Sequence, residues 1–90
     1  MKKESKALLK ECPPENVFWL CTGVTLKNMK ELVSNLKAMD DGVFSYHVNN
    51  DKNDFANWIK DVFKNDKLAD KLKGVVKRKE YLKIIESSFK

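Results

Sequence analysis

His47 is the residue in this chain best suited to acid–base or metal chemistry, because it is the only histidine among 90 residues. Asp51 and Asp54 follow it, and an imidazole with two carboxylates could hold a divalent metal ion or position a general base. The ring also lies within the apolar segment 43–48, where a histidine bonded to a backbone or capping group is the commoner arrangement. We therefore expect a structural role, and we keep a small metal-dependent or enzymatic site around His47 as an alternative.

Nucleophilic and nucleotide-binding chemistry have no motif in this sequence. Cys12 and Cys21 are nine residues apart, which is not a CxxC spacing, and the sequence places no activating basic residue beside them. None of the five serines stands in a glycine-rich elbow, and the three glycines are isolated from one another. We therefore expect no catalytic residue, no metal ligands and no cofactor, with Cys21 buried and Cys12 peripheral.

The positive charge of the chain lies in its last third. Residues 1–59 hold eight lysines and eight acidic residues, whereas residues 60–90 hold ten basic and five acidic residues, so the net charge of +5 arises there. Interspersed acids and a single arginine favour a solvated surface, so any nucleic-acid binding through 71–83 should be weak and not sequence-specific. If the side chains converge near the turn at Gly74, six of them could bind phosphates or an acidic partner. These anion-binding candidates are Lys71, Lys73, Lys77, Arg78, Lys79 and Lys83.

Phe18 and Trp19 are the candidate interface residues. They belong to the apolar run 17–21, which has no polar face and which we expect to form a buried extended segment or a short helical turn. Tryptophan is enriched in the hot spots of protein interfaces, so an exposed Trp19 would mark a partner site or a homodimer contact. Trp58 differs, because it falls within the apolar stripe of a predicted helix and is expected in the core.

The elements that must position these residues are predicted mainly from helical periodicity. Apolar residues at i, i+3 and i+4 spacing predict an amphipathic helix over 26–38, capped by Thr25. The clearest pattern follows Asn53, which we expect to cap a helix that ends near Lys64.

Two further helices are predicted in the last third of the chain. Asn65 should cap a shorter helix that stops at Gly74. A last helix should cover 77–89, with Tyr81 turned towards the core.

Segment 43–48 fits a strand by alternation and a helix by apolar spacing, and we favour a short helix capped by Asp40 or Asp41. Residues 1–14 should form an N-terminal arm or short helix with a Pro-Pro connector, and residues 15–90 the helical core. The sequence thus predicts a single all-α domain over its 90 residues. It should contain four to five short helices, with or without a short extended N-terminal segment.

The chain lacks the apolar length that a membrane span or a signal peptide needs. Its longest apolar run, 17–21, covers five residues, whereas a transmembrane helix takes about 20. Charged residues follow the short apolar stretch 7–9, so no signal-peptide core forms. We therefore expect a cytoplasmic protein that does not associate with membranes.

A string of residues in the middle of the chain is similar to that of a known family. Segment 53–59 reads Asn-Asp-Phe-Ala-Asn-Trp-Ile after His47, and it follows Phe-Trp-Leu-Cys-Thr-Gly at 18–23 and a leucine-rich helix. With this pattern, which runs from Phe18 to about Leu72, the chain resembles an uncharacterised family of small archaeal and bacterial domains. The resemblance implies a helical module that stands alone or is attached to other domains, and it implies no catalytic residues.

The sequence therefore favours a non-catalytic protein-interaction or regulatory module, whose partner is another protein or a second copy of the chain. Weak nucleic-acid or polyanion binding through 71–83 is one alternative. A small metal-dependent or enzymatic site around His47 is the other.

Overall fold

The computed structural model describes residues 6–89 as a succession of short helices interrupted by one hairpin. In chain order the elements are α1 (Lys6–Leu9), the 3₁₀ turn η1 (Pro14–Asn16), β1 (Phe18–Trp19), β2 (Thr25–Leu26), α2 (Met29–Ala38), α3 (Asp41–His47), α4 (Asp54–Phe63), α5 (Asp66–Lys71) and α6 (Arg78–Ser88). The helices predicted after Asn53, after Asn65 and over 77–89 are confirmed as α4, α5 and α6. Among the residues described, no helix has the length and apolar character needed to cross a membrane.

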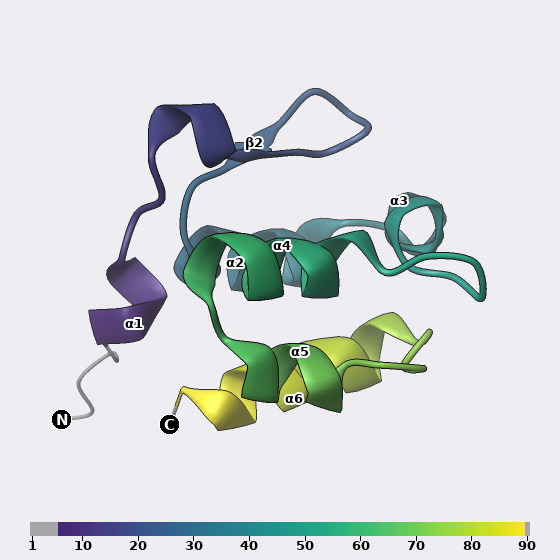
Figure 1. Cartoon of the computed structure of the whole chain (residues 1–90). Coiled ribbons are helices and arrows are strands. Elements are labelled where there is room, and N and C mark those ends of the chain that lie inside the picture. Colours follow the sequence, from purple (N-terminus) through teal and green to yellow (C-terminus); the bar gives the residue numbers. More distant parts are fainter. Residues whose placement is uncertain (1–5, 90) are drawn as a thin grey trace, which may run out of the picture.

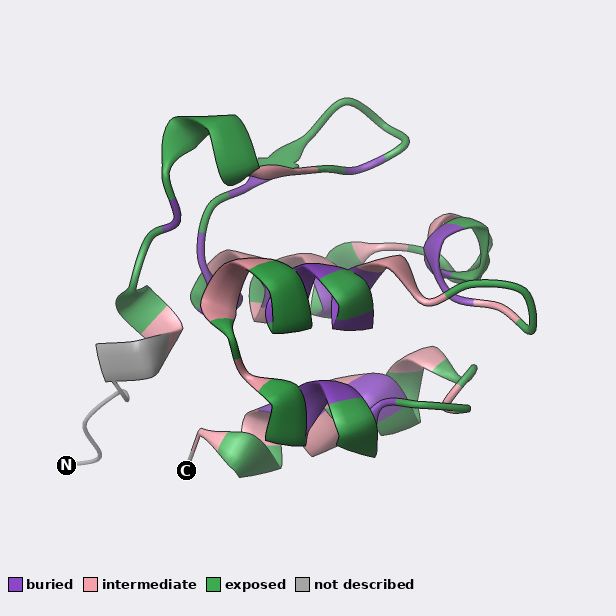
Figure 2. Ribbon diagram, viewed as in Figure 1, coloured by how far each residue is buried: buried purple, intermediate pink, exposed green. Residues whose placement is uncertain are grey.

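Figure 1 shows these elements in three levels. α2 and α4 form the middle level, with the hairpin above and α5 and α6 below, and α3 stands at one end. α4 contacts α5, and α2 contacts α6, so two helix pairs enclose the apolar side chains. Figure 2 shows buried residues on elements of each level.

The spacing of apolar residues in α4 explains its central position. Phe55, Trp58 and Ile59 recur at i, i+3 and i+4, and all three are buried. Trp58 is therefore a core residue, as the sequence predicts. Its indole N–H donates to the carbonyl oxygen of Asn16 at 2.8 Å, and this bond holds η1 against α4.

Side-chain caps begin several of the helices. Asp40, Asn53 and Asn65 each accept a hydrogen bond from the backbone N–H three residues ahead, at the starts of α3, α4 and α5. These bonds satisfy amides that have no partner within the helix. The predicted caps Asn53 and Asn65 are confirmed, and Asp40 is the cap of the two alternatives predicted for α3.

The all-α prediction is wrong in one place, because a two-stranded antiparallel hairpin interrupts the helices. β1 and β2 pair Phe18 with Leu26 and Trp19 with Thr25. Gly23, with φ of 94°, lies in the turn between them, where a residue with a side chain would be strained. The domain is otherwise mostly helical.

The helix predicted over 26–38 begins later than expected. Thr25 is not its cap, because Thr25 lies in β2, and Asn28 caps α2 instead. The apolar spacing was misleading because Leu26 and Met29 both face the core. The helical spacing of apolar residues in α2 therefore includes Leu26, although Leu26 belongs to β2.

Residues 43–47 lie in α3, so the preference for a short helix is confirmed, whereas Val48 is extended and forms an isolated bridge with Asn53. Phe44 and His47, three residues apart in α3, are both buried, whereas Tyr46 between them is exposed. The helix ends at His47, which places the ring at the junction between α3 and the loop that leads to α4.

The predicted burial of the two cysteines is wrong, because the structure reverses it. Cys12 is buried, Cys21 is exposed, and both are free thiols. Cys21 is exposed because it stands in the turn of the hairpin rather than within a strand. Cys12 donates its backbone N–H to the carbonyl oxygen of Lys27 at 2.9 Å, and burial raises the pKa of its thiol.

Asn53 connects the start of α4 to the level below. Its Oδ1 accepts hydrogen bonds from the Ala56 N–H at 3.3 Å and from the Tyr81 hydroxyl, and its Nδ2 donates to the Leu72 carbonyl oxygen at 3.0 Å. Tyr81 is fully buried, and this burial raises the pKa of its hydroxyl. One side chain thus caps α4 and ties it to the end of α5 and to α6.

Replacement of Asn53 should therefore lower the stability of the domain by more than the loss of an ordinary helix cap does. We expect Asn53→Ala to lower the free energy of unfolding by about 2–4 kcal/mol, because it leaves three bonding groups without their partner. Asn65→Ala is the matched control, since Asn65 caps α5 through one bond, and it should cost about 1 kcal/mol. Urea unfolding would measure both, and equal losses would contradict the connecting role of Asn53.

Tyr81 should make the domain sensitive to alkali. An unfolded tyrosine ionises near pH 10, whereas the raised pKa of folded Tyr81 keeps its proton in place. The stabilisation is complete below about pH 10 and is lost as the pH rises further, at up to about 1.4 kcal/mol per pH unit. Urea unfolding between pH 8 and pH 11 should therefore show a steeper loss for the natural chain than for Tyr81→Phe. Parallel losses would refute this assignment.

Candidate functional site

The two candidate interface residues point to opposite sides of the hairpin. Phe18 is partly buried, and its ring centroid lies 4.9 Å from that of Phe55, 5.1 Å from that of His47 and 5.7 Å from that of Trp58. Trp19, the next residue, remains 66% exposed. Because side chains alternate along a strand, the packing of Phe18 into the aromatic cluster turns Trp19 outwards.

The backbone of β1 also faces outwards at Trp19. The Leu20 N–H donates to the Val24 carbonyl oxygen at 2.8 Å, which makes these two residues a hydrogen-bonded pair. Hydrogen-bonded and non-bonded pairs alternate along an antiparallel ladder, so the next pair, Trp19 with Thr25, is non-bonded. The Trp19 N–H and C=O therefore point away from β2. Within residues 6–89 the sheet has only these two strands, so this edge of β1 is free.

The hairpin carries no charge. Residues 17–26 contain no lysine, arginine, aspartate or glutamate, although these residues make up 34% of the chain. Edge strands of natural proteins are commonly protected from pairing by lysine, proline or a bulge. β1 and β2 contain no such residue. Trp19 thus presents an aromatic side chain and two backbone groups on a short, uncharged edge.

His47 attaches the turn of the hairpin to α3. Its ring is 3% exposed, and its Nε2 accepts a hydrogen bond from the Cys21 backbone N–H at 3.0 Å. Its Nδ1 lies 3.0 Å from Oδ2 of Asp54. Since an N–H can donate only to an unprotonated nitrogen, the ring proton belongs on Nδ1, where it is donated to the carboxylate.

Asp54 also holds Lys52, and Lys52 extends the cluster to the surface. The ammonium group of Lys52 lies 3.1 Å from the same Asp54 oxygen and 4.4 Å from the centroid of the Tyr46 ring. Asp51, the other carboxylate that the sequence places near His47, contributes its backbone N–H to a turn with Asn49. Within the part of the chain that the structure describes, no group of three or more His, Cys, Asp and Glu side chains is placed to hold a metal ion.

The six basic candidates do not converge on one hollow. Lys77, Arg78 and Lys79 line a hollow of about 490 Å³ at the start of α6. Lys71 and Lys83 line a second, of about 380 Å³, between α5 and α6. The remaining candidate, Lys73, lines a third of about 320 Å³.

Arg78 is engaged in holding helices together. Its Nε donates to Oδ1 of Asp41 at 2.9 Å, and its Nη1 donates to the Leu36 carbonyl oxygen at 2.8 Å. The guanidinium group therefore joins the start of α6 to the end of α2 and the start of α3. This placement assigns Arg78 a structural role that its position in a basic stretch did not indicate.

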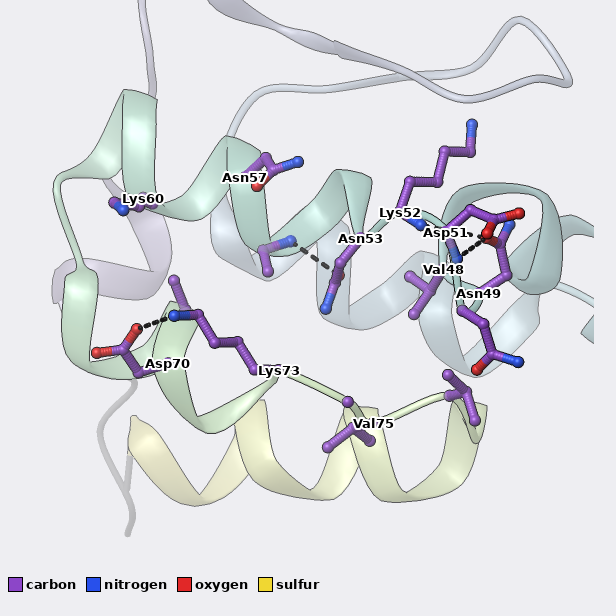
Figure 3. A pocket seen from close by; sticks show the side chains of 15 residues that line it. Val48, Asn49, Asp51, Lys52, Asn53, Asn57, Lys60, Asp70, Lys73 and Val75 are labelled. Carbon is purple, nitrogen blue, oxygen red and sulfur yellow. Dashed lines mark hydrogen bonds and ion pairs between the residues drawn. The ribbon is translucent and has the colours of Figure 1, made fainter.

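The third hollow, shown in Figure 3, is a groove with polar and apolar lining between the loop after α3, α4 and the loop after α5. Lys52, Lys60 and Lys73 line it. Two of these are paired within the chain, Lys52 with Asp54 and Lys73 with Asp70 at 3.3 Å. The groove therefore does not concentrate positive charge, and Trp19 is the more distinctive surface feature.

The attachment of the hairpin to His47 was not predicted from the sequence. Cys21 and His47 are 26 positions apart, and no local pattern links a backbone amide to a distant ring. The nearest signal was the apolar segment around His47, which suggested a bonded, structural ring, whereas Asp54 was considered as a possible metal ligand or partner of a general base. Asp54 does contact the ring, whereas the predicted approach of Asp51 is not seen among the interactions of the described residues.

Comparison with known proteins identifies a family without an assigned activity. A model described as a family of unknown function (DUF5752) matches residues 14–87, which confirms the resemblance and extends it at both ends. No curated protein and no solved structure matches the chain. The function must therefore be inferred from the site itself.

The structural importance of His47 can be measured by mutation. We expect His47→Ala to lower the free energy of unfolding by about 2–4 kcal/mol, because it empties a buried aromatic site and removes the partners of Cys21 and Asp54. Tyr46→Ala is the control from the exposed face of the same helix, and it should cost within about 1 kcal/mol. Chemical denaturation compares them, and a His47→Ala chain as stable as the control would disprove the role.

Proposed function

We propose that this chain, which belongs to the DUF5752 family of unknown function, is a non-catalytic module that binds protein through Trp19 and the free edge of β1. The observation that carries the proposal is a 66% exposed tryptophan on a hairpin whose other face is fixed in the core. Tryptophan is strongly enriched among the residues that dominate binding energy. A non-catalytic role agrees with His47, whose two ring nitrogens are both used within the chain.

The occupant that this edge fits is a second copy of the chain. If two β1 strands approach antiparallel about a two-fold axis at Trp19, each Trp19 N–H faces the C=O of the other. The axis stands perpendicular to the sheet, so both indole rings lie on the same outer face. Residues directly opposite in such a pair have Cα atoms about 5.5 Å apart, which allows the rings to contact each other.

Charge supports this choice of occupant. A chain with a net charge of +5 repels a copy of itself, and the repulsion is least where the approaching surfaces carry no charge. The uncharged stretch 17–26 provides such a surface. The alternative of polyanion binding through 71–83 remains a separate prediction, and the division of the six basic residues among three hollows does not favour it.

Self-association should depend on Trp19. We expect sedimentation equilibrium of the natural chain to show a reversible dimer, and Trp19→Ala to raise its dissociation constant at least about 30-fold, the effect of removing an interface hot spot. Tyr46→Ala is the matched control, because Tyr46 is an exposed aromatic residue outside the hairpin, and it should leave the dimer unchanged. Circular dichroism would verify that both variants remain folded.

Two results would overturn the proposal. One is a natural chain that stays monomeric up to its solubility limit and whose amide spectrum does not change on dilution. The other is a dimer that Trp19→Ala and Tyr46→Ala weaken equally.

A further inference from the structure

We infer that His47 is a proton-sensitive latch, which holds the turn of the hairpin on α3 while its ring is neutral and releases the turn when the ring is protonated. The inference concerns the regulation of the Trp19 surface, and it rests on the proposed function only for the consequence of that release. Its physical basis is the bond from the Cys21 N–H to Nε2 of His47 at 3.0 Å.

That bond can exist only with the neutral ring. Nε2 accepts the hydrogen bond of the Cys21 amide through its lone pair, and a proton taken up from solvent occupies the same lone pair. Two N–H groups would then face each other 3.0 Å apart, so the contact changes from attraction to repulsion. Of the two groups in this contact, the imidazole nitrogen is the one that can take up a proton.

The contact of the His47 ring with Asp54 should keep the ring in place after protonation. Asp54, on α4, lies 3.0 Å from Nδ1 and would pair with the charged imidazolium. Three other groups around the ring can carry charge: Lys52, bound to the same carboxylate, the exposed thiol of Cys21, and Tyr46, whose ring centroid is 4.9 Å away. Among these contacts, the Cys21 bond is the one that protonation breaks and the Asp54 contact is the one that it strengthens.

Release is therefore local to the turn. Cys21 is exposed, so its freed amide can bond to water at little cost, while Phe18 keeps its contacts with Phe55 and Trp58 in the core. The turn joins Trp19 through Leu20, so its release changes the position of the end of the free β1 edge, although the bond between Leu20 and Val24 remains. Under the proposed function, the dimer should weaken as the pH falls through the titration of His47.

Nuclear magnetic resonance of the natural chain tests the latch directly. We expect the Cys21 amide signal and the ring signals of His47 to titrate with the same midpoint. The exchange protection factor of the Cys21 amide should fall roughly tenfold on protonation, as expected for the loss of one hydrogen bond. The Leu32 amide, bonded to the Asn28 carbonyl oxygen within α2, is the internal control. A Cys21 amide that keeps its position and protection while the ring titrates would overturn the inference.

His47→Gln is the matched variant without a titratable ring. The glutamine oxygen can accept from the Cys21 N–H and the glutamine amide can donate to Asp54, as the neutral ring does. The glutamine side chain, however, has no nitrogen that takes up a proton. The Cys21 amide should then be insensitive to pH, and an unchanged titration in this variant would assign the effect to another group. If the variant does not fold, the coincidence of the two midpoints in the natural chain still decides the question.

The experiments can refute the latch and the proposed function independently of each other. Trp19→Ala should lose the dimer but keep the titration of the Cys21 amide, because Trp19 makes no bond to His47 or Cys21. A titrating Cys21 amide in a chain that never dimerises would leave the latch in place and remove the proposed function. A Trp19-dependent dimer with a Cys21 amide that ignores pH would do the reverse.

Discussion

The start of α4 is the point on which the arrangement of the other helices depends. Two consecutive side chains there reach in opposite directions: Asn53 binds Leu72 and Tyr81 in the level below, and Asp54 binds His47 at the end of α3. Helices of 6 to 11 residues are too short to be stable alone in water. Because their polar contacts meet at one helix terminus, each helix is held in place by its neighbours rather than by its own propensity.

The position of the hairpin depends indirectly on the start of α4. Asp54 orients the His47 ring, and that ring provides both an aromatic surface for Phe18 and the acceptor for the Cys21 amide. Because Phe18 packs into the core, the alternation of side chains along the strand directs Trp19 towards the solvent. The exposure of this tryptophan is therefore a consequence of the packing of its neighbour.

Sequence reasoning succeeded where the interactions are local. The caps Asn53 and Asn65 and the apolar stripe of α4 are defined by spacings of three or four residues, which a chain read in order displays directly. It failed where partners are distant, since the amide of Cys21 meets His47 across 26 positions and Arg78 meets Asp41 across 37. The same limit applies to the site: composition identified the candidate tryptophan, but only the chain reversal in the hairpin determines which side of it faces water.

Strand alternation also separates the stability of this domain from its surface chemistry. Along β1, one residue belongs to the aromatic core and the next to the solvent, so a change at Trp19 leaves the packing of Phe18 untouched. The outer face can therefore retain a free, uncharged edge and an apolar ring without loss of stability. In a chain with 34% charged residues, the ten uncharged positions 17–26 coincide with the strands whose edge is free. An apolar ring, free backbone groups and the absence of charge on one short edge are together the properties of a contact surface rather than of a solvated one.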